Sequence, residues 1–153
     1  MVDTFIAHIR EIDGQPQSLS EHLFGTAHLT ERFASKVGLG QQGRIVGLLH
    51  DAGKASIEFC NYIKSANHLL TYDEDEYLDP VSNKGRIDHS SAGAQLIHEF
   101  FKDKAVNKLQ TSQILSLVIA SHHTGLIDCL DPNGDDVFTK RMNKPYEITH
   151  LTL

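Results

Sequence analysis

Residues 45–54 read I-V-G-L-L-H-D-A-G-K, and the fold is best understood outward from this stretch. Apolar residues recur at positions 45, 48, 49 and 52, which is the spacing of a buried helical face. This face leads directly into His50 and Asp51, and Gly53 is typical of a helix end. We therefore expect an imidazole and a carboxylate in the last turn of a buried helix, where a cavity can open. Lys54 lies four residues after His50 and three after Asp51, so it can reach both.

The composition is that of one soluble, globular domain, because 40% of the 153 residues are hydrophobic and 22% are charged. The first residues of the sequence lack the basic region and long apolar stretch expected of a signal peptide, and no apolar run approaches the roughly 20 residues of a membrane span. We therefore expect a cytoplasmic protein in which Cys60 and Cys129 are not bridged. The net charge of −6 argues against a broad basic surface for nucleic acid, although bound divalent cations would reverse the sign locally.

The chain carries 10 histidines, an unusual number, and histidine is the commonest metal-binding side chain. The first to consider lie in a helix predicted from residue 18 or 20 to about residue 37, where glycines end it. The core stripe of this helix comprises Leu19, Leu23, Ala27, Thr30, Ala34 and Val37. His22 falls at the edge of the stripe and His28 nearly opposite it. We expect His22 to face an interior cavity and His28 to face water.

Two later helices also deliver histidines to a buried end. His89 heads a helix whose core stripe continues through Ala92, Gly93, Leu96 and Phe100. His98 is half a turn out of phase with this stripe and is expected to be exposed. A further helix is predicted to open at residue 111 or 112, with its apolar face formed by Leu115, Val118 and Ile119. His122 and His123 occupy its last turn, and Gly125 stops it.

The N-terminal segment has a different pattern. Residues 4–12 partly alternate apolar and polar side chains, which predicts a short strand or an extended arm, and Asp13-Gly14 predicts a turn after it. His8 lies in this segment with no second ligand nearby in the sequence, which favours a structural role for its imidazole.

The remaining segments predict smaller or irregular structure. A helical run over residues 55–64 is expected to pack through Ile57, Phe59, Cys60, Tyr62 and Ile63. Residues 65–84 indicate a loop, and its acidic run lacks the spaced ligands and central glycine of a calcium loop. Residues 102–110 indicate a polar connection, and the chain after Gly125 is rich in turn signals with little periodicity.

Separate predicted helices thus bring histidines to buried ends around one carboxylate. The set comprises His22, His50, Asp51, His89, His122 and His123. Buried imidazoles need hydrogen-bond partners or a metal, and so many in phase with core stripes indicate metal. Imidazole with carboxylate suits zinc, iron, manganese, nickel or cobalt, and the absence of cysteine ligands argues against a structural zinc cage. Two ions bridged by Asp51 is the natural arrangement, and it predicts metal-assisted hydrolysis, with phosphoesters as the leading substrates. Lys54 would add positive charge for the phosphate or leaving oxygen, although a surface lysine that caps a helix end is the alternative.

The motifs S-E-H-L, H-D-A-G-K, D-H-S-S-A-G-A and S-H-H-T-G, in this order, resemble those of the HD-superfamily phosphohydrolases. Their combination is similar to the HD nuclease domain of the type I CRISPR-associated nuclease-helicase, over about residues 5–125. The resemblance implies an all-α HD-domain helical bundle, here with a short N-terminal extended segment. It also implies cleavage of single-stranded DNA exposed by a fused or separate CRISPR helicase, together with a DNA-recognition complex.

Carried over motif by motif, the resemblance implies one metal held by His22, His50 and Asp51. It implies a second metal held by Asp51, His89, His122 and His123, with up to two ions of Mn, Ni, Co, Fe, Mg or Zn. Lys54 matches the family's lysine near the scissile phosphate, so Asp51 and Lys54 are the implied catalytic residues. Asp88 and Ser91 are implied either to support the neighbouring ligand His89 or to form the start of its helix.

The chain departs from the family pattern after His123. The family places a further metal-binding aspartate on a helix well downstream, whereas the aspartates at positions 128, 131, 135 and 136 lie in an expected loop close to the double histidine. We therefore expect residues 1–153 to be a single HD nuclease domain that lacks its C-terminal part. Two alternatives remain open: an HD phosphohydrolase acting on nucleotides or cyclic dinucleotides, and a weakly active metal-binding docking domain. A closed pocket would favour the small substrates, and an open groove would favour a DNA strand.

Overall fold

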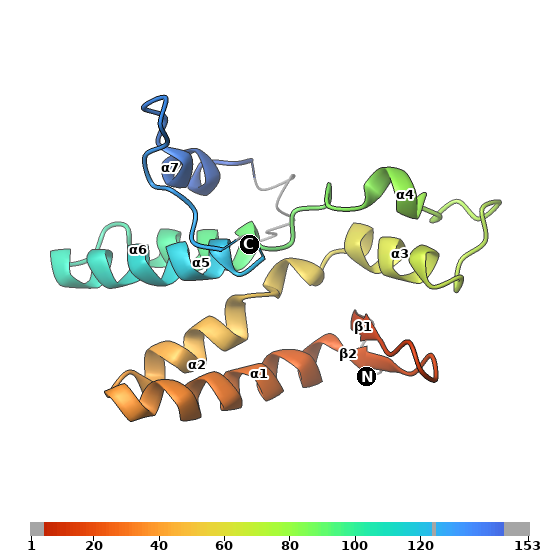
Figure 1. Cartoon of the computed structure of the whole chain (residues 1–153), viewed down its shortest axis with the longest axis horizontal. Coiled ribbons are helices and arrows are strands. Elements are labelled where there is room, and N and C mark those ends of the chain that lie inside the picture. The colour runs from red at the N-terminus through yellow and green to blue at the C-terminus, as the bar shows by residue number, and fades with distance from the viewer. Residues whose placement is uncertain (1–4, 124, 146–153) are drawn as a thin grey trace.

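The computed structural model describes residues 5–123 and 125–145, and within them the protein is mainly helical, as the sequence predicts (Figure 1). The two strands are β1 (Ile6–Ile9) and β2 (Pro16–Ser18). The α-helices are α1 (Leu19–Ala34), α2 (Gly40–Leu49), α3 (Ile57–Ala66), α4 (Pro80–Asn83), α5 (Ser91–Phe101), α6 (Val106–Ser121) and α7 (Val137–Met142). Short 3-10 turns, η1 (Ser35–Val37) and η2 (Ala52–Lys54), follow α1 and α2.

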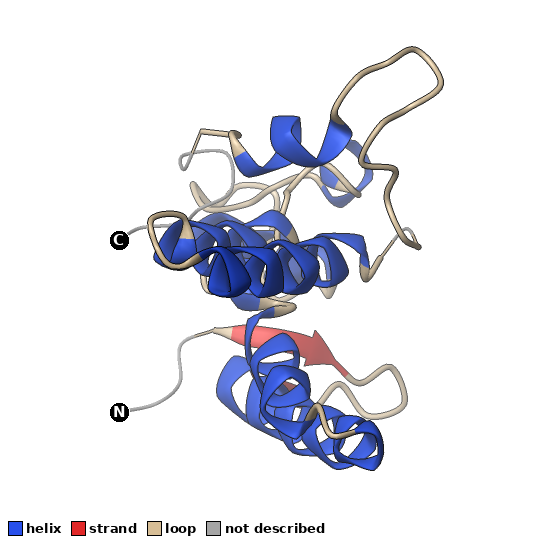
Figure 2. Ribbon diagram, turned by 90° about the vertical axis from the view of Figure 1, so that its left-hand side faces the viewer, coloured by secondary structure: helices blue, strands red, loops and turns tan. Residues whose placement is uncertain are grey.

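Two helical hairpins form the two main layers. In the first layer α1 packs along α2, and in the second layer α5 packs along α6, as Figures 1 and 2 show. α2 also contacts both α5 and α6, and η2 lies against α5, so the chain from α2 to η2 joins the layers. The buried core of the second layer comprises Ala94, Ile97, Leu115, Ile119, Ala120 and Met142. Ile45, Val46 and Leu49 of α2 pack against this core but are only half-buried, so the predicted face contacts the core through Ile45 and Leu49, with Val46 in place of Leu48.

The start of α1 follows from its sequence. The Ser18 side chain accepts a hydrogen bond from the Glu21 amide at 3.2 Å, which caps the helix. Leu19 and Ala27 of the predicted core stripe are buried. Val37 is 73% exposed, so its predicted burial was wrong. The reason is that the chain tightens into η1 after α1, which changes the angular phase of the residues that follow.

β1 and β2 form a small antiparallel hairpin immediately before α1, with His8 opposite Gln17. β1 lies within the predicted extended segment, of which Thr4 falls outside the described residues. β2 was not predicted, because three residues are too few for a recognisable alternation.

The second layer differs from the predictions in two places. α6 begins at Val106, within the segment expected to be a polar connection, because its first turns are solvent-exposed and carry no apolar stripe. Phe100 is 67% exposed rather than buried, since Ile97 and Phe101 provide the side of α5 that packs on the core. In the first two turns of α5, by contrast, Ala92 and Gly93 are buried as predicted.

The surroundings of α3 and α7 complete the domain. Phe59 and Cys60 are buried as predicted, but Ile57, the first residue of α3, is 75% exposed, so its predicted packing was wrong. α7 is a helix of six residues in the segment predicted to be irregular, and the Asp136 carboxylate caps it. Gln95 anchors it from α5 by donating hydrogen bonds to the Met142 and Lys144 carbonyls at 3.0 and 2.8 Å.

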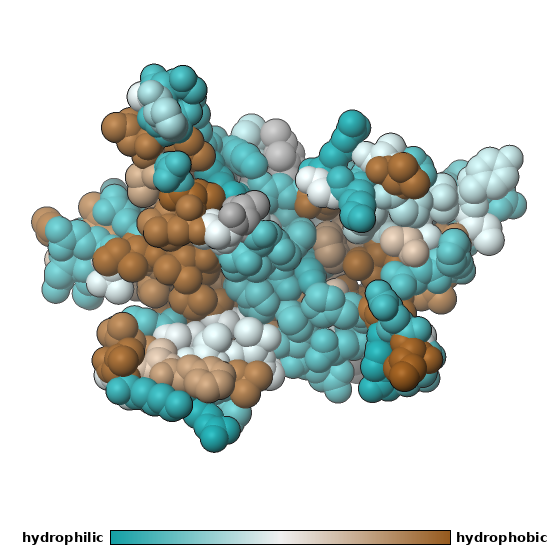
Figure 3. Space-filling model, viewed as in Figure 1, coloured by the Kyte–Doolittle hydropathy of each residue, from teal (hydrophilic) through white to brown (hydrophobic). Residues whose placement is uncertain are grey.

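The surface is mixed in polarity. On the face seen in Figure 3, hydrophobic residues gather over the α5 and α6 side, and hydrophilic residues cover the centre. No helix in residues 5–123 and 125–145 is both long and apolar enough to cross a membrane. Within the same residues, Cys60 and Cys129 form no disulfide, in keeping with the prediction.

Candidate metal centre

Asp51 is the centre of a cluster of basic side chains that come from most parts of the fold. α2 ends at Leu49, His50 closes it, and Asp51 lies in the turn before η2, one step beyond the predicted last helical turn. Asp51 leaves helical geometry (φ −112°, ψ 20°), and its carboxylate contacts His22 of α1 and His122 at the end of α6. Only 3% of the residue is exposed. Its two oxygen atoms face different groups of side chains.

The Oδ2 atom faces residues of the first layer. His22 Nε2 lies 2.9 Å from it and His50 Nε2 lies 3.2 Å from it. The two imidazole nitrogens are themselves 3.1 Å apart. The predicted neighbours of Asp51 in α1 and α2 thus lie together.

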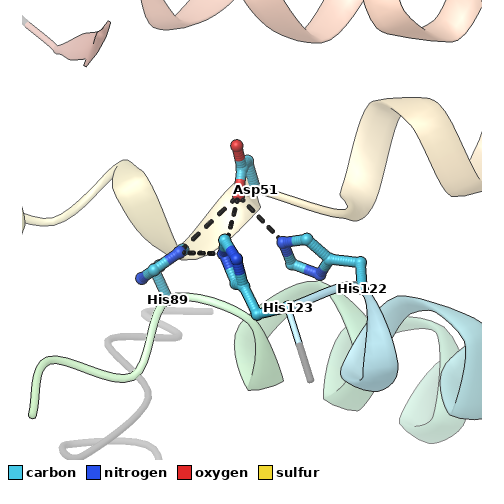
Figure 4. Close-up of side chains that lie close together, drawn as sticks. All are labelled: Asp51, His89, His122 and His123. Carbon is cyan, nitrogen blue, oxygen red and sulfur yellow. Dashed lines mark hydrogen bonds and ion pairs between the residues drawn. The ribbon is translucent and has the colours of Figure 1, made fainter. Parts of the chain in front are cut away.

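The Oδ1 atom faces residues that precede α5 or end α6. His122, His89 and His123 place their Nε2 atoms 3.2, 3.8 and 4.0 Å from it. Figure 4 shows these three imidazoles converging on Asp51 from one side. His89 and His123 also approach each other, with 2.6 Å between their Nε2 atoms. His89 and the adjacent pair His122 and His123, more than 30 residues further along the chain, therefore share one carboxylate oxygen.

These distances fit metal ions. Ligands about 2.1 Å from one tetrahedral or octahedral ion lie roughly 3.0–3.4 Å from each other. The separations around Oδ2, from 2.9 to 3.2 Å, lie at the lower end of this range or just below it. Those around Oδ1, from 2.6 to 4.0 Å, bracket it. Both groups can therefore close around an ion with small side-chain movements.

The hydrogen bonds of two histidines also suit metal. His50 Nδ1 donates to the Gly47 carbonyl at 2.9 Å, and His122 Nδ1 donates to the Ile119 carbonyl at 2.7 Å. A neutral imidazole with this tautomer directs the lone pair of Nε2 toward Asp51. A lone pair facing a carboxylate is repelled unless a proton or a cation lies between them, so the backbone prepares both rings to bind a cation.

The shifted pKa values of these side chains also favour the protonation states that bind metal. Burial lowers the pKa of His89 to about 4, and burial likewise lowers the pKa of His22 and His123. Burial alone would raise the pKa of Asp51, but hydrogen bonds from His122 and His50 and the charge of Lys54 outweigh it and hold that pKa far below its usual value. At neutral pH the carboxylate is ionised and His89 is neutral, which are the forms that bind metal.

His50 is shifted in the opposite direction. Burial lowers the pKa of its imidazole, but the hydrogen bond to Asp51, the charge of Asp51 and the bond to Gly47 together raise it above its usual value. His50 therefore holds a proton more readily than His22 and His89 do, so protons compete with a metal ion for its Nε2 atom.

Lys54 is buried next to Asp51, with only 4% of the residue exposed. Its ammonium lies 3.0 Å from Asp51 Oδ2 and donates to the Ala7 carbonyl at 3.2 Å. Its third contact is His8 Nε2, at 3.3 Å. Lys54 thus adds a fixed positive charge on the Oδ2 side, in place of the exposed lysine that was the alternative.

Asp88 and Ser91 hold the backbone that carries His89. The Asp88 carboxylate accepts hydrogen bonds from the Ser91 amide at 3.0 Å and hydroxyl at 2.7 Å, and from Lys144 Nζ at 2.6 Å. Arg141 of α7 donates to the Ser91 hydroxyl at 2.8 Å. Burial would raise the pKa of Asp88, but Lys144 and Ser91 lower it to about 2. The segment after α7 is therefore tied to the loop before α5.

His8 was expected to be structural, yet it lies at the cluster. Its ring packs edge-on against the His22 ring with 4.7 Å between centroids. The signal that could have revealed it is the Asp13-Gly14 turn, which folds β1 back onto β2 and hence next to the first turns of α1. The other two histidines considered lie elsewhere: His28 is exposed, as predicted. His98 is half-buried rather than exposed, because its ring packs on Phe138 of α7.

A helical domain with an ionised, buried carboxylate among imidazoles at helix ends defines the HD class of metal-dependent hydrolases. Within that class the chain belongs to the Cas3 HD-domain family, since the family model described as Cas3, HD domain matches residues 12–145. Membership implies a CRISPR-associated, metal-dependent nuclease. A search of curated proteins found no significant match.

Proposed function

We propose that this protein cleaves single-stranded DNA by two-metal phosphodiester hydrolysis in CRISPR antiviral interference. The observation that carries the proposal is that the two oxygen atoms of the Asp51 carboxylate face different histidines. Its Oδ2 atom faces His22 and His50, and its Oδ1 atom faces His89, His122 and His123. A carboxylate that presents each oxygen to its own imidazole group can bridge two ions. Such ions, when bound, supply an activated water and stabilise the phosphoryl oxygens.

The residues of the chain contribute charge and access. Asp51 provides the bridging negative charge, and Lys54 supplies a positive charge beside it to help balance the phosphate or leaving oxygen. His22 and His50 are interior, with 17% and 15% of their side chains exposed. His123 has 51% of its side chain exposed, so the Oδ1 side is the edge that a substrate reaches from solvent. An open edge suits a passing strand better than a small substrate held in a closed pocket.

The proposal also covers the partners of the protein and its location in the cell. A CRISPR helicase, fused or separate, would deliver the single strand, and a DNA-recognition complex would select the target. The site of action would be the cytoplasm. The metal ions would be drawn from Mn, Ni, Co, Fe, Mg and Zn, because imidazole and carboxylate ligands suit the transition metals among them.

The experiment is degradation of circular single-stranded DNA with manganese, nickel or cobalt. We expect cleavage by the wild type, none by Asp51→Ala, and wild-type rates for His28→Ala, which removes an exposed histidine of α1. Intact DNA with every metal, beside rapid hydrolysis of deoxynucleotides or cyclic dinucleotides, would show a small-molecule phosphohydrolase instead. Metal uptake with no hydrolysis of any substrate would show a docking domain.

A further inference from the structure

We propose that His8 is an additional ligand of the ion on the Oδ2 side of Asp51, completing a set with His22, His50 and Asp51. This inference rests on the proposed function only in assuming that this side binds an ion. Among residues 5–123 and 125–145, Asp51 is the single carboxylate in either candidate metal group, so the Oδ2 side has no second acidic ligand there. His8 supplies a further neutral donor at that position.

The position of His8 Nε2 supports a ligand role. The potential ligand atoms of His8, His22 and Asp51 all lie within 4.8 Å of one another. The His8 ring meets the His22 ring at 73°, an edge-on contact. Its Nε2 atom points inward, because it lies 3.3 Å from the ammonium of buried Lys54. Its Nε2 atom is therefore close enough to His22 and Asp51 to share an ion with them.

β1 is held in the position that a ligand role for His8 requires. Its pairing places His8 opposite Gln17, and the register shifts between Ile6 and His8, an irregularity of the kind that redirects a side chain. The strand is tied at two further points: the Leu19 amide donates to the Phe5 carbonyl at 2.9 Å, and Lys54 donates to the Ala7 carbonyl at 3.2 Å. Ala7 itself is fully buried. His8 is therefore held at the site from both sides of the strand.

The His8 side chain is also open to solvent. A hollow of about 360 Å³ opens beside His8, between the hairpin and the start of α1, and its lining includes Arg10, Gln17 and Glu21. An ion can therefore reach the His8 imidazole from solvent, as the entry path to a metal site requires.

The competing explanation is that His8 only accepts a hydrogen bond from Lys54 and so holds the ammonium against Asp51. The two roles differ in what removing Lys54 does. If His8 acts through Lys54, its loss should have no further effect once Lys54 is gone. If His8 binds the ion itself, its loss weakens metal binding whether or not Lys54 is present.

The test measures binding of Mn²⁺ and Co²⁺ by equilibrium dialysis and calorimetry, on the whole chain stripped with chelator. We expect two ions per wild-type chain, and a roughly 10–100-fold weaker second ion in His8→Ala, the range for losing a residue that supports a metal site. The first ion should bind normally. His8→Gln, whose amide still accepts from Lys54, should show the same loss, and its circular dichroism verifies folding. His28→Ala is the matched control.

The decisive comparison is made in a Lys54→Met background. Adding His8→Ala there should again weaken the second ion by a similar factor. Loss of the effect in that background, tight binding of both ions by His8→Gln, or uptake of only one ion by the wild type would overturn the His8 assignment. Failure of the proposed function is a separate result: a wild-type chain loaded with two ions that leaves single-stranded DNA intact.

Discussion

Asp51 is a buried negative charge whose neighbours determine whether the apo protein tolerates it. Taking a carboxylate out of water costs several kcal/mol unless cations and hydrogen-bond donors replace the water. His22 and His89 are largely neutral near pH 7, because burial lowers their pKa. The Lys54 ammonium, 3.0 Å away, is therefore a main source of positive charge for this carboxylate.

We predict that Lys54→Met destabilises the metal-free protein by about 3 kcal/mol, because it leaves the Asp51 carboxylate buried without its cation. Saturating Mn²⁺ should restore most of this loss, since bound ions replace the missing positive charge. Urea unfolding in EDTA and in Mn²⁺ measures both values. Lys140→Met is the control, because that lysine pairs with Asp135 at the surface and should change stability little. Equal stability of Lys54→Met and wild type in EDTA would refute the compensating role.

At the scale of elements, the cluster exists because backbones approach closely where side chains are absent. A Cβ atom on Gly93 would collide with the Leu49 carbonyl oxygen, and one on Gly53 would collide with the backbone of His89. The contact at Gly93 packs α5 onto the end of α2. The contact at Gly53 sets the η2 turn against His89, in the loop before α5. These two glycines thereby bring His89 to Asp51.

We predict that Gly93→Ala destabilises the protein by about 3 kcal/mol or more and weakens metal binding, because the Leu49 carbonyl is backbone and cannot rotate away. Gly25→Ala is the matched control: it lies within α1 with nothing within 4 Å of the new Cβ. This control should gain about 0.5–1 kcal/mol from helix propensity. Thermal unfolding and calorimetric metal titration of both variants measure the contrast. Normal metal affinity in Gly93→Ala would show that α5 can shift without moving His89.

The contacts of Asp88 make a second element-scale prediction, which depends on pH. Its pKa is lowered from the ordinary value near 3.8 to about 2, so the charged form favours the folded state. The resulting stability is present above about pH 4 and is lost as pH falls through about 2. Asp88→Asn should therefore cost about 2 kcal/mol at pH 6, where it removes charge-assisted bonds from Lys144 and Ser91.

Urea unfolding of wild type and Asp88→Asn between pH 6 and pH 2.5 measures this dependence. The difference between the two proteins should shrink toward the acid end. Asp135→Asn, at an exposed ion pair, should show a small difference throughout. A difference for Asp88→Asn that stays constant over this range would mean that Asp88 acts by shape rather than by charge.

At the scale of the whole molecule, the sequence was informative where the deciding pattern is local. His22, His50 and His122 could be placed at the ends of buried faces because a helix repeats its faces within a few residues. The packing of the two layers then brings those helix ends together. The sequence does not show this packing directly; it only indicates that many buried imidazoles need partners. The metal roles of these residues remain predictions that the experiments above test.

The features that could not be predicted depend on contacts between distant segments or on very short elements. His8 reaches Lys54 only through the β hairpin, 46 residues away in sequence. α7 has six residues, too few for a helical period to emerge, and its packing on α5 is what half-buries His98. Ile57 is exposed at the first position of α3, and no periodicity identifies that point.

The ligand set spans both layers, and this makes the last prediction one about the whole fold. His22 comes from α1, His89 from the loop before α5, and His122 from the end of α6. An ion that binds only when these elements are assembled stabilises the native state by about 2.7 kcal/mol at a free concentration 100 times its dissociation constant. For a chain of this size we expect Mn²⁺ to raise the melting temperature by about 5–10 °C and EDTA to reverse it.

Differential scanning calorimetry with and without chelator measures this shift. Asp51→Asn, which keeps the shape of the side chain but removes the charge that both groups share, should show almost no response to metal. His28→Ala should respond as the wild type does, because its imidazole faces solvent on α1. A full metal-dependent shift in Asp51→Asn would place the stabilising ion outside the cluster. The Asp51 carboxylate would then bridge nothing, and the assignment of two ions to its two oxygen atoms would fail with it.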